Sequence, residues 1–139
     1  MLRVTYKIHW EDKGLLIDFT GRVDRSDFDK VRAFVLRDER IETLQYHISN
    51  FLGMTEIAYS INDIEKCAHL DGATAQSSPN MKAVIVCDQE DSLALASLYQ
   101  AEMRDSAWQC EFFTTLSAAR AWIDNTPLNK KNLYYRAGL

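Results

Sequence analysis

The sequence predicts a single α/β domain whose mixed sheet of about five strands, in the order ββαβαβαβα, is flanked by helices. Apolar and polar residues alternate from Val4 to Trp10, which is typical of a strand with one solvated face. The unbroken apolar run from Ala83 to Cys87 is typical of a central parallel strand covered on both faces. The segment from Cys110 to Ile123 reads as an aromatic strand followed by a helix with one apolar stripe, which needs a sheet beneath it.

The N-terminal third predicts a hairpin, a helix and a third strand. Residues 11–14 form a turn that contains glycine, and residues 15–20 return as the second strand of the hairpin. Asp24 or Ser26 is expected to cap the first helix, because the free N–H groups of a first turn accept such partners. The apolar stripe of this helix is expected to comprise Phe28, Val31, Phe34 and Val35. Residues 44–49 alternate again and predict the third strand.

The next segments predict a loop, a helix and a second loop before the apolar strand. Residues 50–54 are expected to form a loop, and Thr55 is expected to cap the second helix. The inward face of that helix is expected to carry Ile57, Ile61, Ile64 and Ala68. Residues 71–80 are rich in Gly, Ser, Asn and Pro, so they predict a surface loop and no domain boundary.

The C-terminal part predicts a third crossover helix, a last strand and a last helix. Residues 88–91 are expected to cap the third helix, whose inward side chains are Leu95, Leu98, Tyr99 and Met103. The last strand covers residues 108–114, and the last helix covers residues 116–123 and ends before Pro127. Helical crossovers between the later strands require parallel pairing, whereas the opening hairpin is antiparallel.

Composition sets limits on the class of protein. The chain has 139 residues, of which 47% are hydrophobic and 26% charged, so one substantial core is expected. We expect an α/β domain over residues 1–126 and a basic, aromatic tail over residues 127–139, either frayed or docked. The net charge of −4 and the lack of an interior basic run argue against nucleic acid as a partner. No signal peptide or membrane-length apolar segment is evident, and three widely spaced cysteines predict a reduced, cytoplasmic protein.

Two segments resemble a known family. Residues 46–54, Tyr-His-Ile-Ser-Asn-Phe-Leu-Gly-Met, resemble a strand followed by a Phe-x-Gly turn, and Phe112-Phe113 leads to Ala118-Ala119-Arg120-Ala121-Trp122-Ile123. Their order and spacing resemble the SpoIIAA-like branch of the STAS fold, known from bacterial anti-sigma-factor antagonists, over roughly residues 3–124. The resemblance implies a STAS-like single domain and a regulatory role exerted through protein contacts.

The chain departs from that family at its regulatory turn. Classical antagonists place a phosphorylatable Ser or Thr in an Asp-Ser-Ser-Gly-type turn between the third strand and the second helix. The corresponding residues 52–56 read Leu-Gly-Met-Thr-Glu, so Thr55 lies nearest to that position but lacks its neighbours. The resemblance therefore supports the fold, and the antagonist function is not transferred.

Candidate site residues follow from the expected topology. The carboxyl ends of parallel strands meet helix N-termini, which attract anions and polar ligands. The polar residues expected at this edge are Ser49, Asn50, Thr55, Asp88, Ser92, Thr114 and Thr115. Phe51, Leu52 and Met54 are expected to form an apolar loop there that binds a partner or an apolar ligand. The alternative interpretation is that Thr55, Asp88 and Thr115 are only helix caps.

Other chemistry-bearing residues point to no catalytic or metal site. Cys67 and His69, with Asp71 nearby, lack a second ligand pair, and positions two apart on a helix point about 200° away from each other. His9 and His47 lie on polar faces of their strands, either as solvent-facing residues or as a pH-sensitive pair if those strands are neighbours.

These observations predict a non-enzymatic regulatory module that binds a protein partner or a second copy of itself, with no cofactor. The alternative is a carrier or sensor of a small apolar or anionic ligand held between sheet and helices. An enzyme would need a buried polar cluster with shifted pKa values, which the sequence does not indicate.

Overall fold

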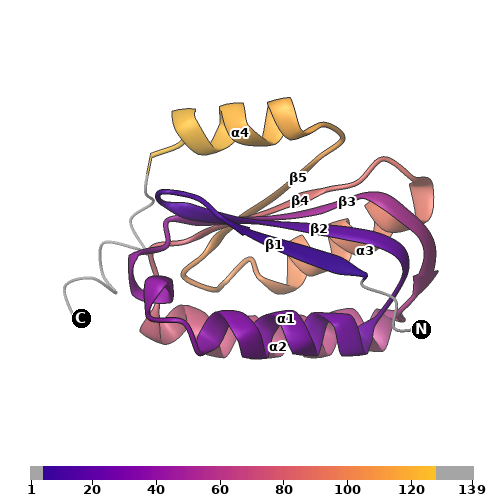
Figure 1. Ribbon diagram of the computed structural model, residues 1–139, viewed down its shortest axis with the longest axis horizontal. Coiled ribbons are helices and arrows are strands. Elements are labelled where there is room, and N and C mark those ends of the chain that lie inside the picture. Colours follow the sequence, from indigo (N-terminus) through magenta and orange to yellow (C-terminus); the bar gives the residue numbers. More distant parts are fainter. Residues whose placement is uncertain (1–4, 128–139) are drawn as a thin grey trace.

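The computed structural model describes residues 5–127, which form one sheet with helices on both faces (Figure 1). The strands are β1 (Tyr6–Trp10), β2 (Gly14–Asp24), β3 (Tyr46–Ala58), β4 (Lys82–Val86) and β5 (Gln109–Phe113). The helices are α1 (Arg25–Leu36), the 3-10 helix η1 (Glu39–Thr43), α2 (Ile61–Ser77), α3 (Glu90–Glu102) and α4 (Leu116–Asn125). The predicted element order ββαβαβαβα and the mixed five-stranded sheet are confirmed.

The strands follow one another across the sheet in the order β1-β2-β3-β4-β5. β1 is antiparallel to β2, and every later pair is parallel. Because each crossover moves one strand further in the same direction and such crossovers are right-handed, α1, α2 and α3 all cover one face. After β5 the chain returns over the opposite face as α4, which Figure 1 shows on the far side of the sheet from α1 and α2.

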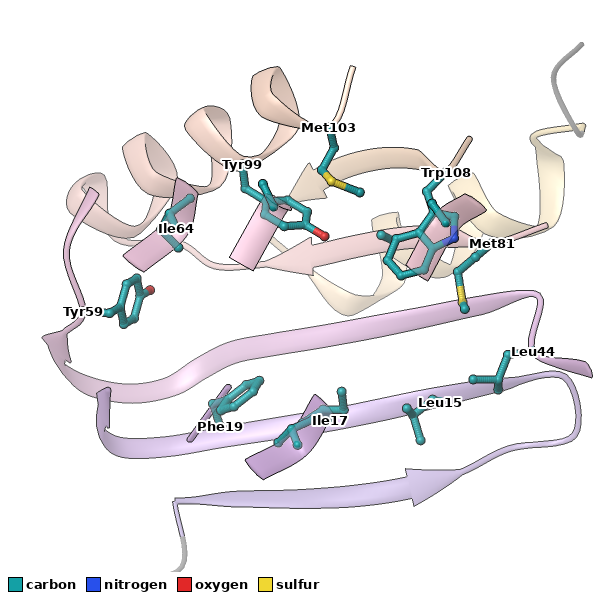
Figure 2. Packing of buried hydrophobic residues seen from close by; sticks show 14 of the residues in the cluster. Leu15, Ile17, Phe19, Leu44, Tyr59, Ile64, Met81, Tyr99, Met103 and Trp108 are labelled. Atoms are coloured by element: carbon teal, nitrogen blue, oxygen red, sulfur yellow. The ribbon is translucent and has the colours of Figure 1, made fainter. Parts of the chain in front are cut away.

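Each face of the sheet has its own apolar core. The larger core fills the space between the sheet and α1–α3, and Figure 2 shows Leu15, Ile17 and Phe19 of β2 on the side that faces it. Tyr99 of α3, Met103 directly after that helix and Trp108 complete that core. The smaller core lies under α4 and consists of Ile48, Val84, Val86 and Ala119, with Phe113, Leu116, Trp122 and Ile123 packed against it.

In α1 one prediction is wrong and another is confirmed. Phe34 is not part of the buried stripe of α1 and is 53% exposed, because its helical position lies about 90° from the inward direction of Phe28, Val31 and Val35. Asp24 caps α1, as one of the two predicted candidates, in a capping box with Asp27.

The predicted loop over residues 50–54 is wrong, because β3 continues to Ala58 and pairs with the long strand β2 up to its end. The pairing of β2 with β3 contains two register shifts, which indicate bulges. Gly21 of β2 and Gly53 of β3 lie at these shifts. Gly21 has a φ of +71°, and a Cβ on Gly53 would lie 2.9 Å from Thr20 Cγ2. The glycine at position 53 therefore allows close approach of two strands where the sequence had indicated a turn.

The predicted boundaries of the second helix are also wrong. Because β3 is longer, α2 begins at Ile61, and Ile57 belongs to β3. The predicted surface loop over residues 71–80 is largely helix, since α2 continues to Ser77 with Ala75 fully buried. Of the predicted tail, only Pro127 is described; its carbonyl accepts a hydrogen bond from Gln109 Nε2 at 3.0 Å, and residues 128–139 lie outside the described part.

Candidate functional site

The carboxyl ends of the parallel strands align at one edge, where Asn50, Val86 and Phe113 are in register. Asp88 follows β4, and Thr114 and Thr115 follow β5, so these three exposed residues lie just beyond the ends of neighbouring strands. The structure thus brings the predicted residues after β4 and β5 to one edge of the sheet. The predicted residues of β3 are distributed differently.

Ser49 and Asn50 point to opposite faces of the sheet, because successive side chains of a strand alternate. Ser49 is in register with Ile17 and Ile85 and faces the larger core. Asn50 faces the α4 side, where its Nδ2 donates to Asp18 Oδ1 at 2.9 Å and its Oδ1 accepts from the Leu52 backbone N–H at 3.1 Å. Asn50 therefore stabilises the bulge in β3 and shares no site with Ser49.

The exposed apolar loop predicted around Phe51 and Met54 does not exist. Phe51 stacks on Phe19 with ring centroids 4.7 Å apart, and Met54 is buried in the larger core. Of the three apolar residues, only Leu52 is exposed. The reason is the longer β3, whose alternation directs Phe51 inward and Leu52 outward.

Of the three residues that could be helix caps only, one caps a helix and two do not. Thr115 caps α4, with its Oγ1 accepting from the Ala118 N–H at 3.1 Å, as predicted. Thr55 is an exposed residue of β3, and the cap of α2 is Ser60. Asp88 is not a cap either, because α3 begins after Gln89, which makes no side-chain capping bond.

The positions of these caps predict a ranking of alanine variants. Ser60→Ala and Thr115→Ala are each expected to lower the free energy of unfolding by about 1 kcal/mol, since each removes an acceptor for a first-turn N–H. Thr55→Ala is expected to change it by less than about 0.5 kcal/mol, because Thr55 is an exposed strand residue. Urea denaturation followed by circular dichroism measures all three. A larger loss for Thr55→Ala than for Ser60→Ala would contradict the assigned start of α2.

A cavity of about 160 Å³ lies between the sheet and helices α1, α2 and α3. Most of its lining is apolar, but it also includes Arg32 of α1, His47 of β3, Asp71 of α2 and Tyr99 of α3. These four polar residues come from four different elements. The cavity is therefore the place in the described chain where polar side chains converge inside an apolar core.

The Asp71 carboxylate is the centre of this polar cluster. Arg32 donates to its Oδ1 from Nε at 3.2 Å and from Nη2 at 3.1 Å, and the Tyr99 hydroxyl donates to its Oδ2 at 2.7 Å. Burial raises the pKa of Tyr99 well above its ordinary value, and the charge of Asp71 adds to this rise. Tyr99 thus stays protonated as a donor, and the cluster ties α1 and α3 to α2.

His47 lies on the sheet side of the same cavity. Its ring contacts Trp108 edge-on, with centroids 5.4 Å apart, and its Nδ1 is buried without a hydrogen-bond partner. His9 is instead half-exposed, with its Nε2 3.1 Å from Asp18 Oδ2. The pH-sensitive pair, which required neighbouring strands, does not form, because β2 separates the two strands and the histidines face opposite sides of the sheet. The alternative of solvent-facing side chains holds for His9 and is wrong for His47, which lines the cavity.

The burial of His47 predicts a pH dependence of stability. Burial lowers the pKa of His47 below its ordinary value of 6.5, the charge of Asp71 opposes this lowering, and that of Arg32 adds to it. The unfolded chain therefore binds this proton more readily, and stability should fall as the pH drops below about 6.5. Urea denaturation between pH 7.5 and 5 measures this fall. In a His47→Phe variant the free energy of unfolding should fall less steeply with decreasing pH. Equal slopes for the variant and the wild type would contradict the prediction.

Two of the three cysteines, Cys67 and Cys87, are buried. Burial raises the pKa of the Cys67 and Cys87 thiols, which disfavours the thiolate needed for nucleophilic attack. Within residues 5–127 no group of three or more His, Cys, Asp or Glu side chains is placed to hold a metal ion. No helix in the described part of the chain is long and apolar enough to cross a membrane.

The polar cluster was not predicted, although the sequence contains a signal for it. Arg32 lies four residues after Phe28 and three before Val35, so it belongs to the inward face of α1. Asp71 continues the inward series of Ile64 and Ala68 on α2 at helical spacing. A charged residue on each of two apolar helix faces indicates a buried ion pair, provided that the helix is recognised through position 71.

Comparisons with known proteins support the fold. No protein-family model matches the sequence, and no curated protein matches it. A structure of the anti-sigma factor antagonist SpoIIAA in its unphosphorylated form matches with a TM-score of 0.57 and 9% identity, covering 86% of this chain and 98% of that one. A structure of the Bacillus cell fate determinant SpoIIAA in the phosphorylated form matches with a TM-score of 0.53 and 11% identity, covering 84% and 97%.

A third structure agrees with these two. It is an uncharacterised protein of the DUF3478 family with a SpoIIAA-like fold from Shewanella loihica PV-4, with a TM-score of 0.54 and 12% identity, covering 85% of this chain and 91% of that one. At these identities the likeness concerns the fold, and it extends over nearly the whole described chain. The chain therefore has a STAS-type, SpoIIAA-like fold.

Proposed function

We propose that this chain is a non-enzymatic regulatory module of the cytoplasm that acts by binding another protein. The fold it shares with an anti-sigma factor antagonist supports this role. The observation that carries the proposal is Ile61, which is 61% exposed in the first turn of α2. A large apolar side chain in water at a helix start gains free energy when a partner covers it.

The residue before Ile61 supports a regulated contact. The comparison structures include SpoIIAA in both unphosphorylated and phosphorylated forms. The family resemblance places the phosphorylatable residue between the third strand and the second helix, and here the exposed hydroxyl residue in that turn is Ser60. A phosphate on Ser60 would meet the Asp63 carboxylate, which accepts from the Ser60 N–H at 2.9 Å. The charge repulsion would rearrange the first turn and Ile61 with it.

Affinity capture with matched variants tests the proposed surface. The tagged wild-type chain is expected to retain a specific protein from an extract of its native cells, and Ile61→Asp is expected to lose it. Leu70→Asp is the control, because Leu70 is also exposed on α2, at 41%, but lies more than two turns further along the helix. If Ile61→Asp and Leu70→Asp retain the same proteins as wild type, the surface is wrongly placed.

Sedimentation equilibrium covers the case in which the partner is a second copy of the chain. Dimers of the wild-type protein that dissociate in Ile61→Asp but persist in Leu70→Asp would support self-association through the same surface. A Ser60→Asp variant, which mimics the phosphate charge, is expected to weaken whichever contact is found.

A further inference from the structure

Two side chains that line the cavity between the sheet and α1–α3 each carry a buried nitrogen without a hydrogen-bond partner. One is Nη1 of Arg32, which forms an ion pair with Asp29 Oδ1 at 3.5 Å but no hydrogen bond of normal geometry to an oxygen, and the other is Nδ1 of His47. Both residues line the cavity, one from α1 and one from β3. Native proteins leave few buried polar atoms unsatisfied, and each lost hydrogen bond destabilises the fold. Two such atoms at one cavity indicate a missing polar partner.

The charges around the cavity favour a neutral partner. The positive charge of Arg32 is already matched by Asp71 at 3.1 Å, and Asp29 lies on its solvent side. Burial lowers the pKa of His47, so this side chain adds no positive charge at neutral pH. A carboxylate or phosphate in the cavity would be desolvated without a free countercharge. A neutral oxygen that accepts a hydrogen bond from Arg32 Nη1 avoids this desolvation of a charge.

The size and lining of the cavity limit the rest of the molecule. Its volume is about 160 Å³, and a cavity of about 150 Å³ lined by apolar side chains is known to hold one benzene molecule. Apolar side chains from the sheet and all three helices line it, among them Leu15, Ile17, Phe28, Val31, Leu95 and Trp108. Its occupant must therefore be compact and largely apolar.

We propose that this cavity binds a neutral molecule about the size of one aromatic ring, whose carbonyl or hydroxyl oxygen accepts a hydrogen bond from Arg32 Nη1. Nδ1 of His47 provides the second polar contact on the sheet side. Because the Arg32–Asp71–Tyr99 cluster joins the three helices, such a ligand would also order their packing over the sheet. This site is independent of the proposed protein-binding surface, so an Ile61→Asp variant should still bind the ligand in the cavity.

Three probes of similar size test the chemistry of the ligand. Acetophenone has a ring and a neutral carbonyl, ethylbenzene lacks the oxygen, and benzoate carries a charge. In two-dimensional NMR titrations of the full chain, acetophenone is expected to bind with a Kd on the order of 1 mM, as suits about nine heavy atoms. Ethylbenzene and benzoate are each expected to bind about tenfold more weakly, because they lack the neutral acceptor.

Variants locate the binding within the cavity. Ala83→Leu fills the cavity from β4 and should abolish the acetophenone shifts, including that of the Trp108 indole N–H. His47→Phe should reduce the preference for acetophenone over ethylbenzene, whereas Arg120→Met, on the opposite face, should preserve it. The proposal is overturned if acetophenone gives no saturable shifts, if ethylbenzene binds equally well, or if Ala83→Leu leaves binding unchanged.

Discussion

Replacing Trp108 with alanine is expected to lower the free energy of unfolding by about 3–5 kcal/mol, the range for removing a buried aromatic side chain. Trp108 is buried directly before β5, where its indole Nε1 donates to the Ser78 carbonyl oxygen at 2.7 Å. Its ring also packs edge-on against His47. The variant therefore enlarges the cavity, leaves the Ser78 carbonyl without its partner and weakens the junction between α2 and β4.

Trp122→Ala is the matched control for this prediction. Trp122 is only half-buried, and its ring lies 6.0 Å from that of Phe113 in the smaller core under α4. Its removal is expected to lower the free energy of unfolding by about 1–2 kcal/mol, because less apolar surface returns to water than for Trp108. Urea denaturation monitored by far-ultraviolet circular dichroism compares the two without relying on tryptophan fluorescence. If Trp108→Ala lowers the free energy of unfolding by no more than Trp122→Ala does, the core beneath α1–α3 is loosely packed.

The architecture was predictable because it depends on patterns that repeat along the chain. Alternation over β1, the apolar run of β4 and the stripe of α4 each indicate how many faces of the element are covered. Three crossovers in one direction then place α1, α2 and α3 together. Thr115 as the cap of α4 was equally accessible, since it precedes the helix directly and its oxygen suits the free N–H of Ala118.

The start of α2 was not predictable from the same patterns. Gly53 reads as a loop residue in isolation, but in the fold it permits a bulge beside Thr20 of β2. That bulge depends on a partner strand more than thirty residues earlier in the chain, which no local pattern reports. Once β3 is extended, Phe51 turns inward, Thr55 becomes a strand residue and Ser60 becomes the cap. One misplaced boundary therefore accounts for several misassigned site residues.

The cluster beneath α1 escaped prediction for a related reason. Asp71 precedes Gly72 and a stretch of small polar residues that resembles a loop. The helix persists because Ala75 is buried in the larger core. Tertiary contacts thus override the weak helix propensity of this segment, as they commonly do.

Replacing Arg32 with methionine is expected to lower the free energy of unfolding by about 3 kcal/mol, because it leaves a buried carboxylate without its countercharge. The side chains of Arg32 and Asp71 are only 16% and 19% exposed, so water replaces little of the lost interaction. The Tyr99 hydroxyl still donates to Asp71 in the variant, but one neutral donor does not balance the charge. Urea denaturation at neutral pH and at several salt concentrations measures the loss, which should depend little on salt.

Arg120→Met distinguishes this buried pair from an ion pair nearer to solvent. Arg120 donates to Glu11 Oε2 at 2.8 Å, but its side chain is 42% exposed, and Tyr46 remains to donate to the same carboxylate. Arg120→Met is expected to lower the free energy of unfolding by no more than about 1 kcal/mol. This destabilisation should become smaller at high salt. If both variants cost the same and respond equally to salt, Asp71 is hydrated in the folded protein. The cavity beside it would then be open to water, and a neutral apolar ligand would have no advantage there over an anionic one.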